Sequence, residues 1–563
     1  MKVVIIGGVA GGATAAARIR RLDEKSEIVI FERSGYISYA NCGLPYYIGN
    51  VITDKDELTL QTPAGFKRRF NIDVKIRHEV TVIDKQRKTV TVKNLESGEV
   101  FEESYDKLVL SPGAKPVVPN IPGIWSDKIF TIRTMEDSFA IKKYLQKKQP
   151  KSAVVIGGGF AGIEMAENLH ALGIKVTLIE SSGQLLSHFD YDMAAFIHSE
   201  IRRHGINFML GKTVTGFAEK DGALEVAVGG EKPLRTDMAI MAVGAAPESS
   251  LAEKAGLELG MRKSIVVNSR METSEKDIYA VGDAVQVKNF VTEEDTLMSL
   301  AGPANKQGRI AADNICGIES TYKGAQGSSI VKVFDITAAS TGISEKTAKK
   351  SGIKYDKVIL SPMSHAGYYP GGKVMTIKVL FEKETFRLLG AQIVGYDGVD
   401  KRIDVFATAA RAGLDARELK DIDLVYAPPY SSAKDPVNMA GFMIENVSNG
   451  TLKQWFLEDE ENLPRDGSVT LLDTRTPGEY RRGHVEGFKN IPVDELRNRL
   501  NEIEKEKPVY VICQSGLRSY IASRILEGNG YTAYNFAGGF RFYDTVTNDK
   551  SLVEKSFPCG MDK

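Results

Sequence analysis

The 563-residue sequence has few cysteines, no long apolar segment and no excess of charge of either sign. Its four cysteines, at positions 42, 316, 513 and 559, are too widely spaced for a disulfide framework or a zinc site, and they favour a reducing cytoplasm. No apolar run approaches the length of a membrane span, which argues against a membrane protein. Basic and acidic residues each total 73, so charge does not predict binding to nucleic acid or to a membrane surface. The seven histidines show no metal-binding spacing, and we predict no metal site.

Glycine, by contrast, occurs in informative places. The segment "KVVIIGGVAGGATAAARIRRLDEKSEIVIFER" predicts a strand, a glycine turn, an Ala-rich helix and a second strand that ends at Glu32. Gly7 and Gly12 hold the first and third positions of a G-x-G-x-x-G motif, while Val9 holds the middle one. Such a turn binds a pyrophosphate at the helix N-terminus, and the carboxylate accepts the ribose hydroxyls. Because the match is imperfect, a purely structural glycine turn remains the alternative.

A second segment carries the complete motif. "SAVVIGGGFAGIEMAENLHALGIKVTLIE" places Gly157, Gly159 and Gly162 in register and ends at Glu180. Two βαβ units about 150 residues apart predict that one chain binds two nucleotides. Glu180 would repel a 2′-phosphate, which favours NADH and leaves NADPH as the alternative coenzyme.

A third segment, "TSEKDIYAVGDA", predicts a strand that delivers Gly282 and Asp283 to a helix start. It resembles the second flavin motif of the two-dinucleotide-binding flavoproteins, and "LVLSPGAKP" and "MAVGAAPE" resemble their crossover strands. The resemblance implies FAD at the first site and NADH at the second. It assigns FAD binding to Gly7, Ala10, Gly11, Glu32, Arg33, Asn41, Gly113, Gly282 and Asp283. It assigns NADH binding to Gly157, Gly159, Phe160, Gly162, Glu180 and Gly244.

Cys42 lies in "SYANCGLPYYIG", where Tyr47 stands at the position that a C-x4-C pair would need for its second thiol. The segment resembles the S-x-x-N-C-G-L-P motif of the coenzyme A-disulfide reductases, single-cysteine relatives of glutathione reductase, and the resemblance extends over about residues 1–450. It implies that Cys42 forms a mixed disulfide with coenzyme A beside the flavin. We expect nearby backbone amides and charge transfer to the flavin to favour the thiolate form of Cys42.

The segments "SHAGYYPGGK" and "VYAPPYSSAKDPVN" match the dimerisation domain of that family. The resemblance implies a homodimer in which Tyr368 and Tyr426 reach the partner's cysteine, with Tyr369 and Tyr430 as adjacent alternatives. It assigns coenzyme A binding to Thr14, Arg18, Arg21, Ser38, Asn41 and Lys434. For Arg18 and Arg21 a solvated helix face is an equally good interpretation.

A separate α/β domain is predicted after an acidic linker. Cys513 closes the strand "VYVIC" and opens the loop "CQSGLRS", whose amides would form an anion nest at a helix N-terminus. The domain resembles rhodanese, which implies a persulfide on Cys513, Arg518 steering anionic sulfur donors, and a structural role for Asp473 and Arg475. Phosphatases of the same fold use a loop one residue longer. The implied loop residues are Gln514, Ser515, Gly516, Leu517, Arg518 and Ser519.

We therefore expect an α/β flavoprotein of the glutathione reductase type with an added rhodanese domain. The expected parts are an FAD domain (1–149 and 250–325), an NAD(P)H domain (150–249), a dimerisation domain (326–447), a linker (448–462) and a rhodanese domain (463–563). The expected reaction is NADH-dependent reduction of coenzyme A persulfide, polysulfide or coenzyme A disulfide at Cys42, with sulfane sulfur delivered by Cys513. The alternatives are an NADH oxidase or peroxidase that uses a cysteine sulfenic acid, and a sulfur carrier or redox sensor. Cys316 and Cys559 have no motif around them and are interpreted as a filler and a surface thiol.

Overall fold

The computed structural model describes residues 1–555, so Cys559 lies outside the described residues. The chain falls into two compact units. The first comprises Met1–Gly183 and Ile206–Ala325, and the second comprises Gln184–Gly205 and Gln326–Lys563. No helix in the described part of the chain is both long enough and apolar enough to cross a membrane.

The first unit contains two five-stranded parallel sheets. One has the order β18 (Ile278–Ala280), β7 (Lys107–Leu110), β1 (Lys2–Ile6), β2 (Glu27–Glu32), β3 (Asp73–Ile76). The other has the order β12 (Asn207–Met209), β11 (Lys175–Ile179), β10 (Ser152–Ile156), β16 (Met238–Met241), β9 (Ile129–Thr131). Their central strands are continuous apolar runs because parallel strands are covered by chain on both faces.

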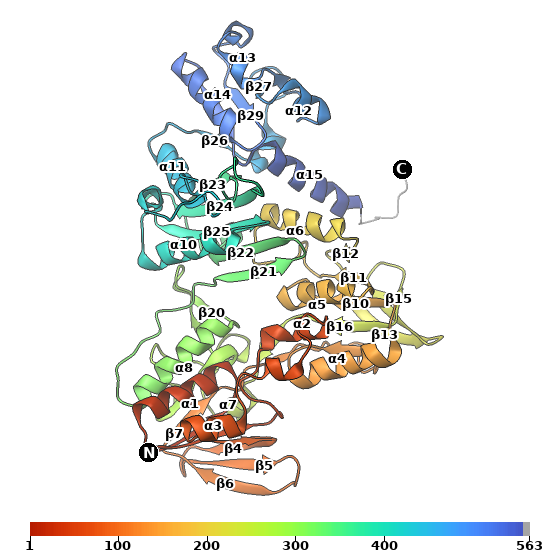
Figure 1. The fold of residues 1–563 in the computed structure, drawn as a ribbon, viewed down its shortest axis with the longest axis vertical. Helices are drawn as coiled ribbons and strands as arrows, with labels where there is room; N and C mark the ends of the chain where they lie inside the picture. The colour runs from red at the N-terminus through yellow and green to blue at the C-terminus, as the bar shows by residue number, and fades with distance from the viewer. Residues whose placement is uncertain (556–563) are drawn as a thin grey trace. The chain divides into compact units, whose positions relative to one another are not determined.

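Two crossover helices follow the glycine turns. They are α1 (Ala10–Leu22) after β1 and α5 (Phe160–Ala171) after β10. Helix α8 (Ala301–Ile315) lies beside α1 (Figure 1). A Cβ on Gly308 of α8 would stand 2.3 Å from the Gly11 carbonyl oxygen, so this pair of helices needs glycine at that contact.

Three local features differ from the sequence expectations. β9 precedes residue 150 yet pairs with β16, and we propose that it belongs with the second nucleotide domain. Gly282 and Asp283 start only a single 3-10 turn, Gly282–Ala284, because the chain continues directly into the strand Gln286–Lys288. Helix α6 (Tyr191–Arg203) clusters with the second unit, although the sequence placed it in the NAD(P)H domain.

The second unit contains an antiparallel sheet and a parallel sheet. The antiparallel sheet has the order β21 (Ser329–Val333), β22 (Ile336–Gly342), β25 (Leu388–Gly395), β24 (Met375–Glu382), β23 (Tyr355–Leu360). The parallel sheet has the order β26 (Gln454–Trp455), β30 (Ala533–Phe536), β29 (Val509–Ile512), β27 (Thr470–Asp473), β28 (Lys489–Asn490). The expected linker thus supplies an edge strand, β26, whose Trp455 is buried.

The parallel sheet is fixed to the rest of its unit by polar contacts. Helix α15 (Gly539–Lys555) lies along α6 (Figure 1), where Asp549 accepts hydrogen bonds from His198 Nδ1 at 2.8 Å and from the Tyr191 hydroxyl at 2.7 Å. On the other side, Lys357 of β23 donates to Glu458 at 2.5 Å. Asp549 and His198 are both buried, so solvent does not weaken this joint.

A buried ion cluster lies in the same unit. The Lys378 ammonium on β24 is fully buried and contacts Asp192 at 2.7 Å, Asp190 at 3.1 Å and also Glu345. These carboxylates raise the pKa of Lys378, and the ammonium groups of Lys378 and Lys357 lower the pKa of Glu345 to about 2 against the effect of burial. Lys378 and Glu345 therefore stay charged inside the fold.

Candidate functional site

Both glycine turns are closed by a carboxylate from the end of the following strand. The Gly8 amide donates to Glu32 at 2.9 Å, and the Gly158 amide donates to Glu180 at 2.6 Å. Each carboxylate also accepts an amide two residues further along its own chain, from Ser34 and Ser182. The two expected ribose-binding carboxylates are thus held beside their turns by the same geometry.

The glycines at these turns are required by close approach. Gly7 and Gly157 have φ values of +97° and +110°, where a side chain would be strained. A Cβ on Gly12 would stand 2.0 Å from the Gly7 carbonyl oxygen, and one on Gly162 would stand 1.9 Å from that of Gly157. The two motifs therefore have the same backbone packing despite the missing middle glycine.

The middle position of the motif, which is Val9 in the first turn and Gly159 in the second, does not need glycine. A Cβ on Gly159 would meet nothing within 4 Å, so no protein contact demands glycine there. Val9 and Gly159 are the N-caps of α1 and α5, and neither cap makes a side-chain hydrogen bond to its helix. Both helices therefore keep N-terminal amides for a pyrophosphate, and the residues present fit two dinucleotides.

Asp283, the expected ribityl ligand, has a partner that the sequence did not reveal. Arg133 donates to its carboxylate at 2.6 Å. Arg133 follows β9, 150 residues away in the chain, and no local motif marks it. Of the other expected nucleotide residues, Arg33 lies 3.9 Å from Glu248, while Gly113 and Gly244 adopt φ values of +73° and +107°.

Cys42 lies in a 3-10 turn, Asn41–Gly43, that leads directly into α2 (Leu44–Ile48). The turn rests on a small apolar cluster of Tyr39, Leu44, Tyr47, Leu58 and Met135. Gly49 ends α2 against α5, where a Cβ would stand 2.1 Å from the Asn168 side chain. The thiol is free and reaches solvent. The packing of α2 on α5 fixes the turn that carries this thiol.

The chain raises the pKa of the Cys42 thiol instead of lowering it. The first cause is desolvation by the protein packed around it, and the second is the negative charge of Glu164. The amides around Cys42 therefore do not by themselves favour the thiolate, and the expected charge transfer to the flavin stays a prediction. Glu164 accepts a hydrogen bond from the Tyr46 hydroxyl at 3.4 Å, and burial raises its own pKa to about 7. Sequence reasoning missed this group, whose only signal is its place four residues after Phe160 in the second glycine helix.

Replacing Glu164 by Gln is expected to lower the pKa of the Cys42 thiol because a negative charge beside the thiolate is removed. Alkylation of Cys42 should become severalfold faster above pH 7, where Glu164 is ionised in the unaltered protein. Below pH 7 the two profiles should converge. Rates of iodoacetamide labelling at Cys42, followed by peptide mass spectrometry, measure this.

Glu167→Gln is the matched control, since it removes the same charge from the same helix without being a direct cause of the Cys42 shift. Equal effects of the two substitutions would mean that Glu164 has no specific role at the thiol.

The expected coenzyme A residues are only partly available. Arg18 pairs with Asp313 at 2.7 Å, and the Thr14 hydroxyl donates to Asn305 at 2.5 Å. The remaining residues of the first unit are Arg21, which is exposed; Ser38, with φ of +44°; and Asn41, whose Oδ1 is buried without a hydrogen-bond partner among the described residues. Lys434 is exposed in the second unit. The orphaned Asn41 oxygen, next to Cys42, is the observation here that fits an absent ligand.

Two tyrosines meet on the surface of the second unit. The hydroxyls of Tyr368 and Tyr426 are 2.6 Å apart, and the side chains are 75% and 47% exposed. The hydrogen bond raises the pKa of Tyr368. Tyr369 instead packs edge-on against His365, so this geometry favours Tyr368 and Tyr426 as a functional pair.

Cys513 lies at the end of β29, immediately before the loop that precedes α14 (Leu517–Gly528). The thiol is buried, and its sulfur accepts hydrogen bonds from the Gly516 amide at 3.1 Å and the Ser519 hydroxyl at 3.2 Å. The start of α15 supports the loop, since the Phe540 amide donates to the Cys513 carbonyl at 2.6 Å. One loop amide and one hydroxyl are therefore directed at this sulfur, and the full nest of successive amides stays a prediction.

Two arginines flank the loop. Arg475 is buried and pairs with Asp473 at 2.7 Å, beneath the ring of Phe540. Arg518 makes two parallel hydrogen bonds to Glu479, at 2.7 and 2.8 Å. Glu479 is the third residue that sequence reasoning missed, because α12 (Pro477–Arg482) reaches the loop only through the fold.

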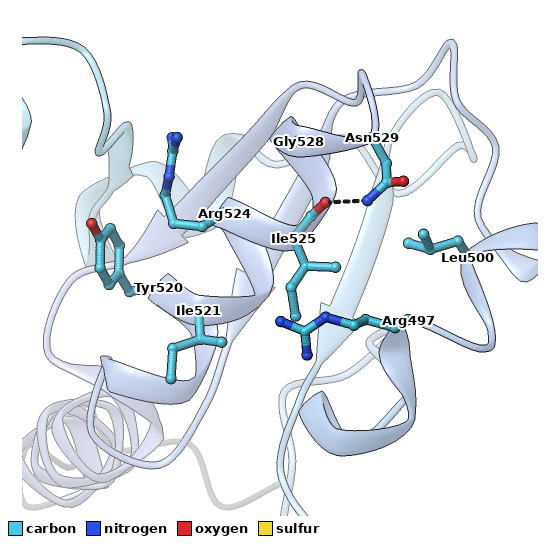
Figure 2. Close-up of a pocket in the computed structure, with 8 residues that line it drawn as sticks. All are labelled: Arg497, Leu500, Tyr520, Ile521, Arg524, Ile525, Gly528 and Asn529. Carbon is cyan, nitrogen blue, oxygen red and sulfur yellow. Dashed lines mark hydrogen bonds between the residues drawn. The ribbon is translucent and has the colours of Figure 1, made fainter.

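The second unit also contains a surface groove and a cluster of potential metal ligands. A groove of 460 Å³ runs along α14, with Tyr520, Ile521 and Arg524 on one side and Arg497 and Leu500 on the other (Figure 2). Cys513 does not line it. Glu200, His204 and Asp335 lie close enough together to hold a metal ion, but the Arg203 guanidinium already bridges the two carboxylates, at 2.7 and 2.8 Å.

Family models match three parts of the chain. The model of the pyridine nucleotide-disulphide oxidoreductases matches residues 1–308, and the model of their dimerisation domain matches residues 328–436. The model of the rhodanese-like domain matches residues 457–544. Coenzyme A disulfide reductase of Staphylococcus haemolyticus is 40% identical over 447 residues, which cover 79% of this chain and all of that protein. The enzyme of the same name from Staphylococcus aureus strain JH9 is 39% identical over 442 residues, 78% of this chain and 99% of that one.

Solved structures extend the similarity over both units. Reduced CoADR-RHD of Bacillus anthracis has a TM-score of 0.95 and 48% identity, covering 97% of this chain and 98% of that one. A NAD-dependent persulfide reductase from A. fulgidus has a TM-score of 0.90 and 37% identity, covering 96% and 100%. A water-forming NADH oxidase from Lactobacillus brevis has a TM-score of 0.77 and 27% identity, covering 80% and 99%. The chain belongs to the pyridine nucleotide-disulphide oxidoreductase family, among the coenzyme A disulfide reductases, and carries a rhodanese-like domain after its dimerisation domain.

Proposed function

We propose that this protein uses NADH and bound FAD to reduce coenzyme A disulfide and coenzyme A persulfide or polysulfide through Cys42. We further propose that the rhodanese-like domain supplies sulfane sulfur from Cys513. The observation that carries the proposal is a free, accessible Cys42 in the turn that leads into α2, which packs on the helix of the second glycine turn. Because Tyr47 replaces a second thiol of a C-x4-C pair, a diffusible thiol must supply the disulfide partner.

One NADH supplies the two electrons that each turnover of the proposed cycle needs. The Cys42 thiolate attacks the coenzyme A sulfur of a persulfide, the S–S bond breaks, and hydrosulfide leaves with its electron pair. FAD, held by the first glycine turn and Glu32, would supply the two-electron chemistry that links NADH to reduction of the Cys42–coenzyme A disulfide. Cleavage returns the Cys42 thiolate and releases coenzyme A, so each turnover converts coenzyme A persulfide and NADH to coenzyme A, hydrosulfide and NAD⁺.

Tyr368 and Tyr426 are proposed to serve the partner subunit of a homodimer. Their exposed, hydrogen-bonded hydroxyls can donate to a departing thiolate, and a better-stabilised leaving sulfur departs faster. Support for the dimer is the match to the dimerisation domain. We infer a cytoplasmic location from the free Cys42, Cys316 and Cys513, since thiols persist in a reducing compartment.

The proposed function is tested by anaerobic NADH oxidation with coenzyme A disulfide and coenzyme A persulfide as separate substrates. We expect turnover with both, and one sulfide released per NADH with the persulfide. An NADH oxidase would instead stop without oxygen, and a redox sensor would not turn over. Anaerobic activity that is absent with both substrates would reject the proposal in favour of these alternatives.

A further inference from the structure

Two of the arginines at the Cys513 loop have side chains that are neutralised by carboxylates. Arg475 is bound by Asp473, and Arg518 is bound by Glu479. A third arginine, Arg541, follows the loop contact at the start of α15, but its guanidinium lies over the ring of Phe196, 5.3 Å from the centroid. The cationic steering expected from Arg518 is therefore offset at its source.

Glu479 is held firmly in this role. Besides the two Arg518 hydrogen bonds, it accepts from the Thr476 amide at 2.9 Å and the Thr476 hydroxyl at 2.8 Å. The Arg518 contact and these bonds lower the pKa of Glu479 to about 2, so it stays ionised at neutral pH. The pair is partly shielded, with side-chain exposures of 31% for Arg518 and 21% for Glu479.

Neutral donors therefore dominate at the sulfur. The Gly516 amide and the Ser519 hydroxyl point at Sγ, and the helix dipole of α14 lies behind them. Such donors stabilise one negative charge on the thiolate or on an outer persulfide sulfur. They do not replace the full cation that a sulfonate-bearing dianion would need.

We propose that Glu479 determines donor specificity, so that Cys513 accepts sulfane sulfur from organic persulfides, whose reacting sulfur group carries a single negative charge, and discriminates against thiosulfate. This inference rests on the proposed sulfur-delivery function. The Cys513 thiolate attacks the outer sulfur of the donor, a new S–S bond forms, and the donor S–S bond breaks. The electron pair leaves on the thiolate of the donor, or on sulfite if thiosulfate reacts, and no oxidant is needed.

The experiment follows loading of Cys513 by intact-protein mass spectrometry, as the gain of one sulfur atom, in the full flavin-loaded chain with Cys42→Ser. Glutathione persulfide and thiosulfate are the two donors. We expect the persulfide to load Cys513 at least about 100-fold faster, and Glu479→Gln to raise the thiosulfate rate about tenfold by freeing the Arg518 charge. The persulfide rate should change less than about threefold.

Two further variants make the result decisive. Glu479→Asp keeps the charge and should keep the selectivity, whereas Arg518→Met added to Glu479→Gln should abolish the gain with thiosulfate. Arg518→Met alone leaves Glu479 unopposed and should slow thiosulfate further, which tests the idea even if the Gln variant folds poorly. Equal rates for both donors, or an equal gain for both in Glu479→Gln, would overturn this inference alone. Failure of both donors to load Cys513 would reject the sulfur-delivery function, and this inference with it.

Discussion

Replacing Cys42 by Ser is expected to reduce anaerobic NADH oxidation with coenzyme A disulfide by at least about 1,000-fold. The serine hydroxyl keeps the size of the side chain but forms no disulfide, so electrons delivered to the site have no sulfur to receive them. Bound flavin should remain, because the glycine turns and the Glu32 carboxylate are untouched. Steady-state assays, with the flavin spectrum as a check on folding, measure this result.

Cys316→Ser is the matched control. Cys316 is a free thiol of the same unit, half-buried at the C-cap of α8, and its substitution should leave turnover unchanged. Cys513 loading by a persulfide should also survive in Cys42→Ser, because that thiol has its own loop. Substantial coenzyme A disulfide turnover without Cys42 would place the redox sulfur elsewhere and refute the proposed cycle.

Replacing Lys378 by Met is expected to lower the free energy of unfolding by about 3–5 kcal/mol. The substitution preserves bulk but leaves Asp190, Asp192 and Glu345 buried without their central cation. Lys354→Met is the control: it removes an ammonium from an exposed pair with Glu384, where the change should be about 0–1 kcal/mol. Denaturant unfolding of the holoenzyme, monitored through the second unit by Trp455 fluorescence, separates the two.

The pH dependence gives a second reading of the same substitution. Glu345 has a folded pKa of about 2, below its ordinary value of 4.5, so its contribution to stability is present above pH 4.5 and is lost as pH falls toward 2. Without Lys378 this contribution is largely absent, so the variant should approach the unaltered protein in stability below pH 4.5. A gap that stays constant across this range would show that the cluster does not act through charge.

Much of the nucleotide-binding architecture could be predicted because it is encoded locally. The positive φ at Gly7 and Gly157, the close approach at Gly162, and carboxylates at the strand ends each follow from a short run of residues. The rhodanese loop was predictable for the same reason, since Cys513 and its hydrogen-bond donors lie within seven residues.

What the sequence did not reveal depends on contacts between distant segments. Arg133 reaches Asp283 across 150 residues, and Glu479 reaches Arg518 across 39. The raised pKa of Cys42 has the same origin, because the protein packed around the thiol desolvates it and Glu164, from another helix, opposes the thiolate. The sequence predicts a linker at β26 because two residues in an acidic segment carry no strand signal of their own.

The anchoring of α15 on α6 bears on how sulfur leaves the rhodanese sheet. Asp549 ties the sheet to His198 and Tyr191 from one side, and Glu458 ties it to Lys357 from the other. A domain that is held at two points is unsuited to transferring sulfur by its own movement. In the proposed function, sulfane sulfur therefore leaves Cys513 on a small thiol acceptor, and the domain keeps its place within the second unit.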